Sequence, residues 1–421
     1  MFKKTFLKND LRVITIPQNS TEAITILVLA KTGSKYEDKE INGISHFLEH
    51  MLFKGTKKRP TPTAVAETLD RVGGIYNAFT SEEYTGFFAK VGSNHFDLAL
   101  DWISDIILNS KLEEKEIEKE KGVIIEEINM YFDHPSSHVQ NLWKELLYKD
   151  QPMGRNIVGS KETVMAISRE KLIRYFKSQY VSSNMIICVA GRFEEREIFK
   201  KIEEKFKKIN IGKPFNKPKV VEIQNKPECI LEERKTDQTH FCLGVRSYNI
   251  FHPKRYDQDI LAVILGGMMS SRLFIEVREK LGLAYYITTD IYSDTDTGFL
   301  VTQAGVDSNK VDKAIKTILK EYKKISQKRV GEKELKKAKD CIKGRMILGL
   351  ERSNDIAFFY GMQEVLENKI LTPKQIYEKI DKITSEDILR VAKDIFNPSK
   401  LNLALIGPFN NKGKFEKLLE I

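Results

Sequence analysis

The segment HFLEH at 46–50 places two imidazoles and one carboxylate within five residues. In an α-helix, which turns by about 100° per residue, His50 lies about 40° from His46 and Glu49 about 60° to the other side. Side chains that share such an arc can converge on one cation. Two surface histidines on an amphipathic helix are the alternative, but seven histidines in 421 residues make a chance H-x-x-E-H uncommon. The spacing therefore predicts a helical zinc site with Glu49 as its general base.

The site needs a third ligand, because catalytic zinc usually has three protein ligands and one open position. The charged segment 113–133 contains no proline and predicts a helix that stops before Pro135. One side of its helical wheel is an apolar stripe, formed by Ile117, Val123, Ile124, Ile128 and Tyr131. Glu120 and Glu127 fall inside this stripe, whereas Glu118 and Glu126 point away from it.

A carboxylate on a buried helix face is unfavourable unless it is paired or binds a metal. This argument selects Glu127 as the third ligand and Glu120 as a group that orients a ligand or holds a proton. A solvated helix with Glu/Lys pairs is the alternative, and it leaves two glutamates on the buried face unexplained. Two imidazoles and a carboxylate suit Zn²⁺, with manganese or cobalt as substitutes in vitro.

These residues stand in segments that resemble the pitrilysin-like metallopeptidases, the inverted zincins of family M16. The resemblance is greatest to short bacterial members related to the catalytic subunit of the mitochondrial processing peptidase. It spans essentially the whole chain in the family's order. The matching segments are GISHFLEHMLFKGT at 43–56, YNAFTSEEYTGFFAKV at 76–91, EKGVIIEEINMY at 120–131, SSRLFIEVREKLGLAYYI at 270–287 and LKKAKDCIKGRMILGLE at 335–351.

The resemblance also implies substrate-binding residues. Asn77, Ala78 and Phe79 match an edge strand that pairs with an extended peptide, a mode of binding that needs only backbone groups. A structural strand with a turn asparagine is the alternative. Arg278 and Tyr285 match a pair that binds substrate backbone or a developing oxyanion, and the alternative is an arginine ion pair beside a core tyrosine.

The helix that carries the histidines has Asn42 and Ser45 as candidate N-caps. Farther along, the proline-containing stretch 208–228 predicts an extended linker, and the order of strands and helices is loosely similar on its two sides. We therefore expect an α+β fold of two homologous α/β-roll domains, each a mainly antiparallel sheet covered by helices. The expected boundaries are 1–211 for a zinc-binding catalytic domain, 212–228 for the linker and 229–421 for a metal-free, substrate-binding domain.

Composition narrows the class of protein. Apolar residues make up 41% and charged residues 30% of the chain, as in soluble globular proteins, and no run of 18 apolar residues predicts a membrane span. The N-terminus lacks the apolar core of a signal peptide, so we expect a cytoplasmic protein, although a mature mitochondrial matrix protein would look the same. The net charge of +10 comes from lysines interspersed with glutamates, and we expect no nucleic-acid partner. Four scattered cysteines indicate neither disulfides nor a thiolate metal site.

Together these features predict a zinc metalloendopeptidase with one Zn²⁺ per chain that hydrolyses peptides or unfolded segments, targeting peptides among them. A non-catalytic structural or peptide-binding subunit on the same fold is the alternative. Related full-length enzymes have four such domains and this chain has two. The resemblance therefore implies a homodimer in which Arg278 and Tyr285 act on the partner's zinc site, or alternatively a heterodimer with a metal-free homologue.

Overall fold

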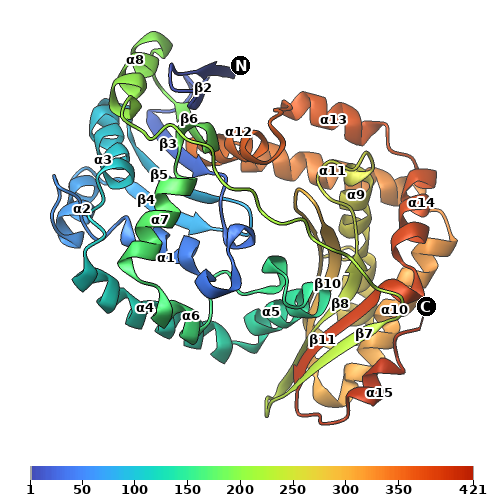
Figure 1. The fold of residues 1–421 in the computed structure, drawn as a ribbon. Helices are drawn as coiled ribbons and strands as arrows, with labels where there is room; N and C mark the ends of the chain where they lie inside the picture. The colour runs from blue at the N-terminus through green and yellow to red at the C-terminus, as the bar shows by residue number, and fades with distance from the viewer. Residues whose placement is uncertain (1, 421) are drawn as a thin grey trace. The chain divides into compact units, whose positions relative to one another are not determined.

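The computed structural model describes residues 2–420 and consists of two compact units (Figure 1). The first contains the residues up to Asn129, Arg155–Pro218 and Ile347–Ile370. The second contains Met130–Gly154, Lys219–Met346 and the residues from Leu371 onward. Each unit has one mixed β-sheet with helices packed on it, which confirms the predicted α+β fold class.

The first sheet has six strands in the order β1-β2-β6-β3-β5-β4. Only β2 and β6 are parallel neighbours, and the other pairs are antiparallel. The strands are β1 (Lys3–Phe6), β2 (Arg12–Pro17), β3 (Ala23–Ala30), β4 (Ile75–Thr80), β5 (Thr85–Gly92) and β6 (Met185–Gly191). The central strand β3 has the predominantly apolar sequence AITILVLA because helices cover both of its faces.

Helices of the first unit form two layers on this sheet. Its larger layer, which includes the helices with the candidate ligands, shares a core with Ile26, Val28 and Phe87. A single helix covers the opposite face and packs on Leu27 and Leu29. The first layer contains α1 (Ile44–Met51), α2 (Pro62–Asp70), α3 (Phe96–Leu108), α4 (Glu114–Asp133), α6 (Lys161–Ala166), α7 (Arg169–Gln179) and α8 (Glu195–Phe206), and the covering helix is α12 (Ser353–Glu367).

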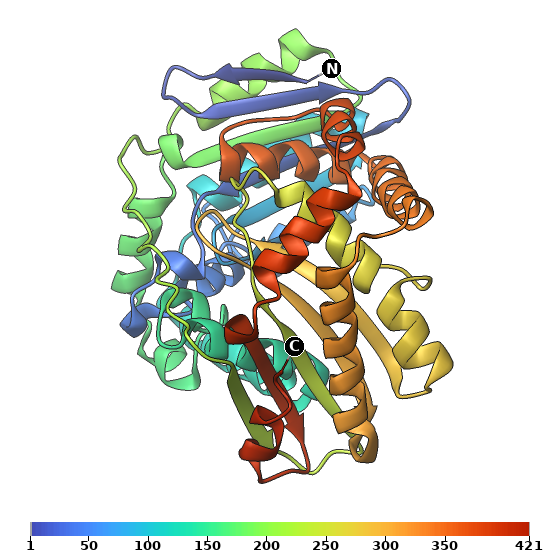
Figure 2. The same ribbon diagram turned by 90° about the vertical axis from the view of Figure 1, so that its right-hand side faces the viewer.

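The second sheet has five strands in the order β7-β11-β8-β10-β9 (Figure 2). The strands are β7 (Glu228–Glu233), β8 (Gln238–Arg246), β9 (Ala284–Ser293), β10 (Gly298–Asp307) and β11 (Leu401–Gly407). One face is covered by α5 (Pro135–Tyr148), whose Trp143 packs on Phe299. On the other face, Tyr322 of α10 (Val311–Gln327) bonds to Thr302. The remaining helices are α9 (Arg255–Leu265), α11 (Glu332–Gly349), α13 (Pro373–Asp381), α14 (Ser385–Ile395) and α15 (Lys412–Glu416).

The two sheets have the same topology once β1 is set aside. The strands β2, β6, β3, β5 and β4 correspond to β7, β11, β8, β10 and β9, and the parallel pair β2–β6 corresponds to β7–β11. The strands β4 and β9 are therefore equivalent edges. This correspondence agrees with the expected duplication.

Each unit includes a helix from the other half of the sequence. The segment Met130–Gly154, which contains α5, belongs to the second unit, and Ile347–Ile370, which contains α12, belongs to the first. Residues 210–227 contain no helix or strand. The boundaries 1–211, 212–228 and 229–421 describe the order of the two sheets in the sequence, and as domain limits they stay a prediction. Within residues 2–420, no helix combines the length and hydropathy that a bilayer crossing requires.

Candidate metal centre

Helix α1 carries His46, Glu49 and His50, as the sequence predicts. Phe47, Leu48 and Met51 bury the opposite side of the helix in the core of the first unit. His46 is 7% exposed, so its imidazole lies almost entirely inside the protein. The apolar side of this short helix therefore fixes the direction in which its polar residues point.

The N-terminus of α1 differs from the expectation. Gly43 is its N-cap residue, with φ of 96°, and neither Asn42 nor Ser45 caps the helix with its side chain. The buried carboxylate of Glu37 does so instead, accepting hydrogen bonds from the backbone N–H groups of Gly43 at 2.7 Å and Ser45 at 2.9 Å. A carboxylate at this position also interacts favourably with the helix dipole. The N-cap prediction was therefore wrong, because a residue outside the helix supplies the acceptor.

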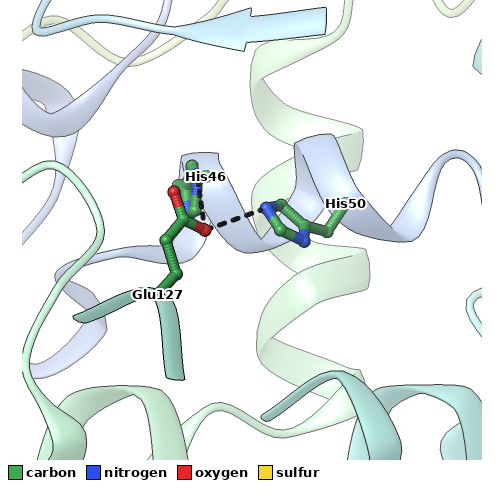
Figure 3. Close-up of side chains that lie close together, drawn as sticks. All are labelled: His46, His50 and Glu127. Atoms are coloured by element: carbon green, nitrogen blue, oxygen red, sulfur yellow. Dashed lines mark ion pairs between the residues drawn. The ribbon is translucent and has the colours of Figure 1, made fainter. Parts of the chain in front are cut away.

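Helix α4 brings Glu127 to the two histidines (Figure 3). Glu127 Oε2 lies 3.6 Å from His46 Nε2 and 3.5 Å from His50 Nε2. The candidate ligand atoms of the three residues all lie within 4.8 Å of one another. Among residues 2–420, this is the one such group of histidine, cysteine and acidic side chains.

The helical wheel of α4 predicted the burial of its glutamates correctly, but it was partly wrong about which apolar residues are buried. Glu120 is 3% exposed, Glu127 is half-buried and Glu126 is exposed, as predicted. Val123 is 51% and Tyr131 37% exposed, however, so they lie outside the buried stripe. The buried strip of this helix is narrower than the wheel suggests, since its buried residues are Ile117, Glu120, Lys121 and Ile124.

The donor set fits a zinc ion. At about 2.1 Å from a tetrahedral cation, neighbouring ligand atoms lie about 3.4 Å apart, close to the separations of Glu127 from the two imidazoles. Nitrogen and carboxylate donors are those that zinc prefers, and a fourth position is left for water. His46 Nε2 is the ring nitrogen that faces Glu127 and is available to a metal, whereas its buried Nδ1 has no hydrogen-bond partner within residues 2–420.

Protonation of the two imidazoles differs strongly. Burial, together with the charge of His50, lowers the pKa of His46 to about 4. Burial also disfavours the charged form of His50, but hydrogen bonds with Glu120 and Glu127 outweigh it and raise its pKa to about 9. Between these values the metal-free pair carries one proton, on the imidazole that the carboxylates surround.

Glu120 and Lys54 lie behind His50. Glu120 Oε1 is 2.8 Å from His50 Nδ1, and Glu120 Oε2 is 2.6 Å from Lys54 Nζ. Burial alone would raise the pKa of Glu120, but the hydrogen bonds from His50 and Lys54 outweigh burial and hold it below its ordinary value. Glu120 is thus an ionised acceptor beside the His50 ring, and its predicted role in orienting a metal ligand stays a prediction.

Glu49 lies beside the ligands without belonging to the metal-binding group. Thr80 Oγ1, at the end of β4, donates a 2.6 Å hydrogen bond to Glu49 Oε2. Burial raises the pKa of Glu49, and the Thr80 hydrogen bond opposes this in part. A carboxylate with a raised pKa beside a metal site has the properties of a general base. Next to it is a pocket of about 250 Å³, lined by Glu49, His50, Phe53, Lys54, Tyr76 and Asn77.

The residues expected to bind substrate on β4 do lie on an edge strand. Asn77 is exposed, and its Oδ1 accepts a 2.9 Å hydrogen bond from the N–H of Ala78. The N–H of Ala78 therefore faces the open edge of the sheet. The Phe79 ring packs on Phe358 and over Gly86, where an added Cβ would lie 2.1 Å from it. Phe79 can therefore offer a peptide only its backbone.

The structure brings Arg278 and Tyr285 together in the second unit. Arg278 lies on a π-helix, Phe274–Lys280, which is followed by Gly282 with φ of 55°. Gly305 and Val306, which are consecutive in β10, pair with Tyr286 and Ala284 of β9. Tyr285 therefore has no pairing partner and forms a β-bulge. The Arg278 guanidinium lies 5.7 Å from the exposed Tyr285 ring. Their role at a partner's zinc site stays a prediction.

Three residues that contact the site or the start of the helix that carries it were not predicted: Glu37, Lys54 and Thr80. Lys54 follows His50 by four positions, so continuing the same helical face by one turn could have found it. Thr80 directly follows the predicted strand residues. Glu37 gives no signal in the sequence, because its role depends on a loop that returns to the start of α1.

Comparisons with known proteins identify the family of this chain. Residues 12–161 match the family described as Insulinase (Peptidase family M16), and residues 166–341 match the Peptidase M16 inactive domain. An uncharacterized zinc protease of Bacillus subtilis is 34% identical over 98% of this chain and 99% of its own length. An uncharacterized zinc protease of Rickettsia felis is also 34% identical, over 98% of this chain and 99% of its own.

Solved structures share the fold. A protease from Helicobacter pylori has a TM-score of 0.90 at 23% identity, covering 97% of this chain and 99% of that one. A chain of complex III2 from Candida albicans has a TM-score of 0.85 at 19% identity, covering all of both chains. At these identities the likeness concerns the fold alone. The family models and the zinc protease relatives together show that this chain belongs to peptidase family M16, the insulinase family.

Proposed function

We propose that this protein is a zinc-dependent endopeptidase that hydrolyses peptides or unfolded polypeptide segments, with one Zn²⁺ per chain. The convergence of His46, His50 and Glu127 around one position, with Glu49 beside it, is the observation that carries the proposal. The three ligands leave a coordination position for water, and Glu49, the base, is not itself a ligand. Zinc in this position supplies Lewis acidity toward a peptide carbonyl and makes a water molecule more acidic.

Glu49 is the residue that moves protons in this proposal. It takes a proton from the attacking water and delivers it to the nitrogen of the leaving amine, so the peptide bond breaks without a covalent intermediate. Burial raises its pKa and so makes it a stronger base. Thr80 donates its hydrogen bond to Oε2 of the Glu49 carboxylate, so Oε1 is the oxygen that accepts the proton of the water. Nothing in this scheme requires a serine or cysteine nucleophile.

Strand β4 provides a place for the substrate backbone. An extended peptide can add to the open edge of this strand, using the outward N–H of Ala78 once the Asn77 side chain releases it. The freed Asn77 amide can then bind the peptide near the cleaved bond. Backbone pairing tolerates varied side chains and requires an extended chain, which favours unfolded peptides, including targeting peptides, over folded proteins.

We also propose that the active assembly contains two chains. Arg278 and Tyr285 form an exposed pair that suits a peptide carbonyl or an oxyanion, and they belong to the metal-free unit. A homodimer lets this pair act on the zinc site of its partner, and a heterodimer with a metal-free homologue is the alternative. Mixing a Glu49→Gln chain with an Arg278→Ala chain tests the arrangement: action in trans restores activity to one site, whereas no restoration contradicts it.

A comparison of wild type with Glu49→Gln tests the peptidase proposal. Removing the base should leave zinc content unchanged and lower kcat on a quenched peptide by about 10²–10⁴-fold. Glu126→Gln makes the same chemical change at an exposed position of α4 and should keep wild-type turnover. A wild type that binds zinc but hydrolyses no peptide would favour the non-catalytic, peptide-binding alternative. Undiminished activity in Glu49→Gln would refute the assigned base.

A further inference from the structure

Lys54 has a place in the metal site that the proposed mechanism does not use. Helix α1 ends at Met51, and the chain continues in a tight turn in which the N–H of Phe53 bonds to the carbonyl of His50 and that of Lys54 to Met51. This turn keeps Lys54 on the side of the helix that carries His50. Its Nζ lies 2.6 Å from Glu120 Oε2, while Glu120 Oε1 lies 2.8 Å from His50 Nδ1. The buried carboxylate therefore connects the lysine to the ligand.

Lys54 supplies the positive charge beside Glu120. Glu120 is 3% exposed, and a buried carboxylate is unfavourable without a nearby counter-charge. A metal-binding imidazole is neutral, so His50 bound through Nε2 gives Glu120 an N–H donor but no positive charge. The counter-charge then comes from Lys54, whose side chain is 25% exposed.

The two histidines differ in how they are held. His46 Nδ1 has no hydrogen-bond partner in the described part of the chain, so no hydrogen bond at this atom orients the ring. His50 Nδ1 has the Glu120 carboxylate. Of the two histidines, His50 is thus the one whose orientation depends on a hydrogen bond at Nδ1. A change in Glu120 should therefore affect the metal through the His50 ring.

We propose that Lys54 is a positioning residue of the metal centre, which acts on zinc affinity by holding Glu120 against His50. The inference rests on the zinc site of the proposed function, but not on peptidase activity. It extends the functional pattern of the helix by one turn, from H-x-x-E-H to H-x-x-E-H-x-x-x-K. Lys54 also lines the pocket beside Glu49, so peptide turnover alone cannot separate the two roles.

Zinc affinity without substrate is the appropriate measurement. Lys54→Met should weaken zinc binding about tenfold, the lower end of the range for residues that support metal ligands, as read by competition with a chromogenic chelator. Lys54→Arg keeps the charge and should stay within about threefold of wild type. Lys58→Met is the matched control, because Lys58 is 60% exposed, pairs with Asp101 and makes the same change in net charge. It should bind zinc as wild type does.

A double-mutant cycle with Glu120→Gln shows whether Lys54 acts through this carboxylate. If it does, Lys54→Met should weaken zinc binding in the wild-type background and have little effect in the Glu120→Gln background. Equal losses in both backgrounds would overturn the inference, as would wild-type affinity in Lys54→Met. If the wild-type chain itself binds no zinc, the proposed function fails; if it binds zinc and Lys54→Met equals it, only this inference fails. Thermal unfolding of the metal-free variants confirms that they are folded.

Discussion

Zinc binding by this site should depend on pH, because the metal must displace the proton of His50. The pKa of about 9 for His50 means that the metal-free site is protonated at neutral pH, whereas His46, with a pKa of about 4, is already neutral. At pH 7, about two units below this pKa, displacing the proton costs free energy, and each unit corresponds to about 1.4 kcal/mol. Zinc binding at pH 7 should therefore be weaker than at pH 9 by about 100-fold, or about 3 kcal/mol.

The sign follows from which form binds the metal. Below about pH 9 each unit of rising pH should increase zinc affinity about tenfold, and above it the affinity should level off. Calorimetric titration at pH 7 in buffers of different ionisation enthalpy should show about one proton released per zinc ion. Glu120→Gln removes a cause of the raised pKa, so the level region should begin at a lower pH. An affinity that does not change between pH 6 and 8, with no proton release, would refute this account of the site.

The other expectations concern single side chains near the metal. Glu127→Gln should lower zinc retention in dialysis, whereas Glu126→Gln should not; the reverse result would mean that α4 presents a different face to α1. Thr80→Val removes the hydrogen bond to Glu49 and should lower kcat on a quenched peptide about tenfold with little change in KM. Thr80→Ser keeps the hydroxyl and should restore kcat, and equal losses in both variants would contradict a role for this hydroxyl.

The sequence was informative about the metal ligands because they follow local periodicity. His46, Glu49 and His50 are fixed by one helix turn, and Glu120 and Glu127 by two turns of another. The edge position of β4 was also foreseen. A helical wheel shows which side of a helix is apolar but not how wide the partner surface is, which is why Val123 and Tyr131 were misplaced.

Features that depend on packing between distant segments could not be predicted. The Glu37 carboxylate caps α1 from a loop, in place of the Asn42 or Ser45 side chain that local rules favour. The π-helix that bears Arg278 and the irregular pairing at Tyr285 were not predicted either. The apolar residues of α5 and α12 are compatible with helices that cover a sheet, but they do not say which sheet each one covers.

The exchange of α5 and α12 between the two halves affects how this protein can be dissected. A fragment that ends in the linker would lack α12 and expose the apolar residues of β3 and β6, including Leu27, Leu29 and Ile186, to solvent. A fragment that begins there would lack α5, the partner of Phe299. We therefore expect neither half of the chain to fold stably by itself. A single repeat would have to obtain the missing helix from a second copy, as a domain-swapped pair does.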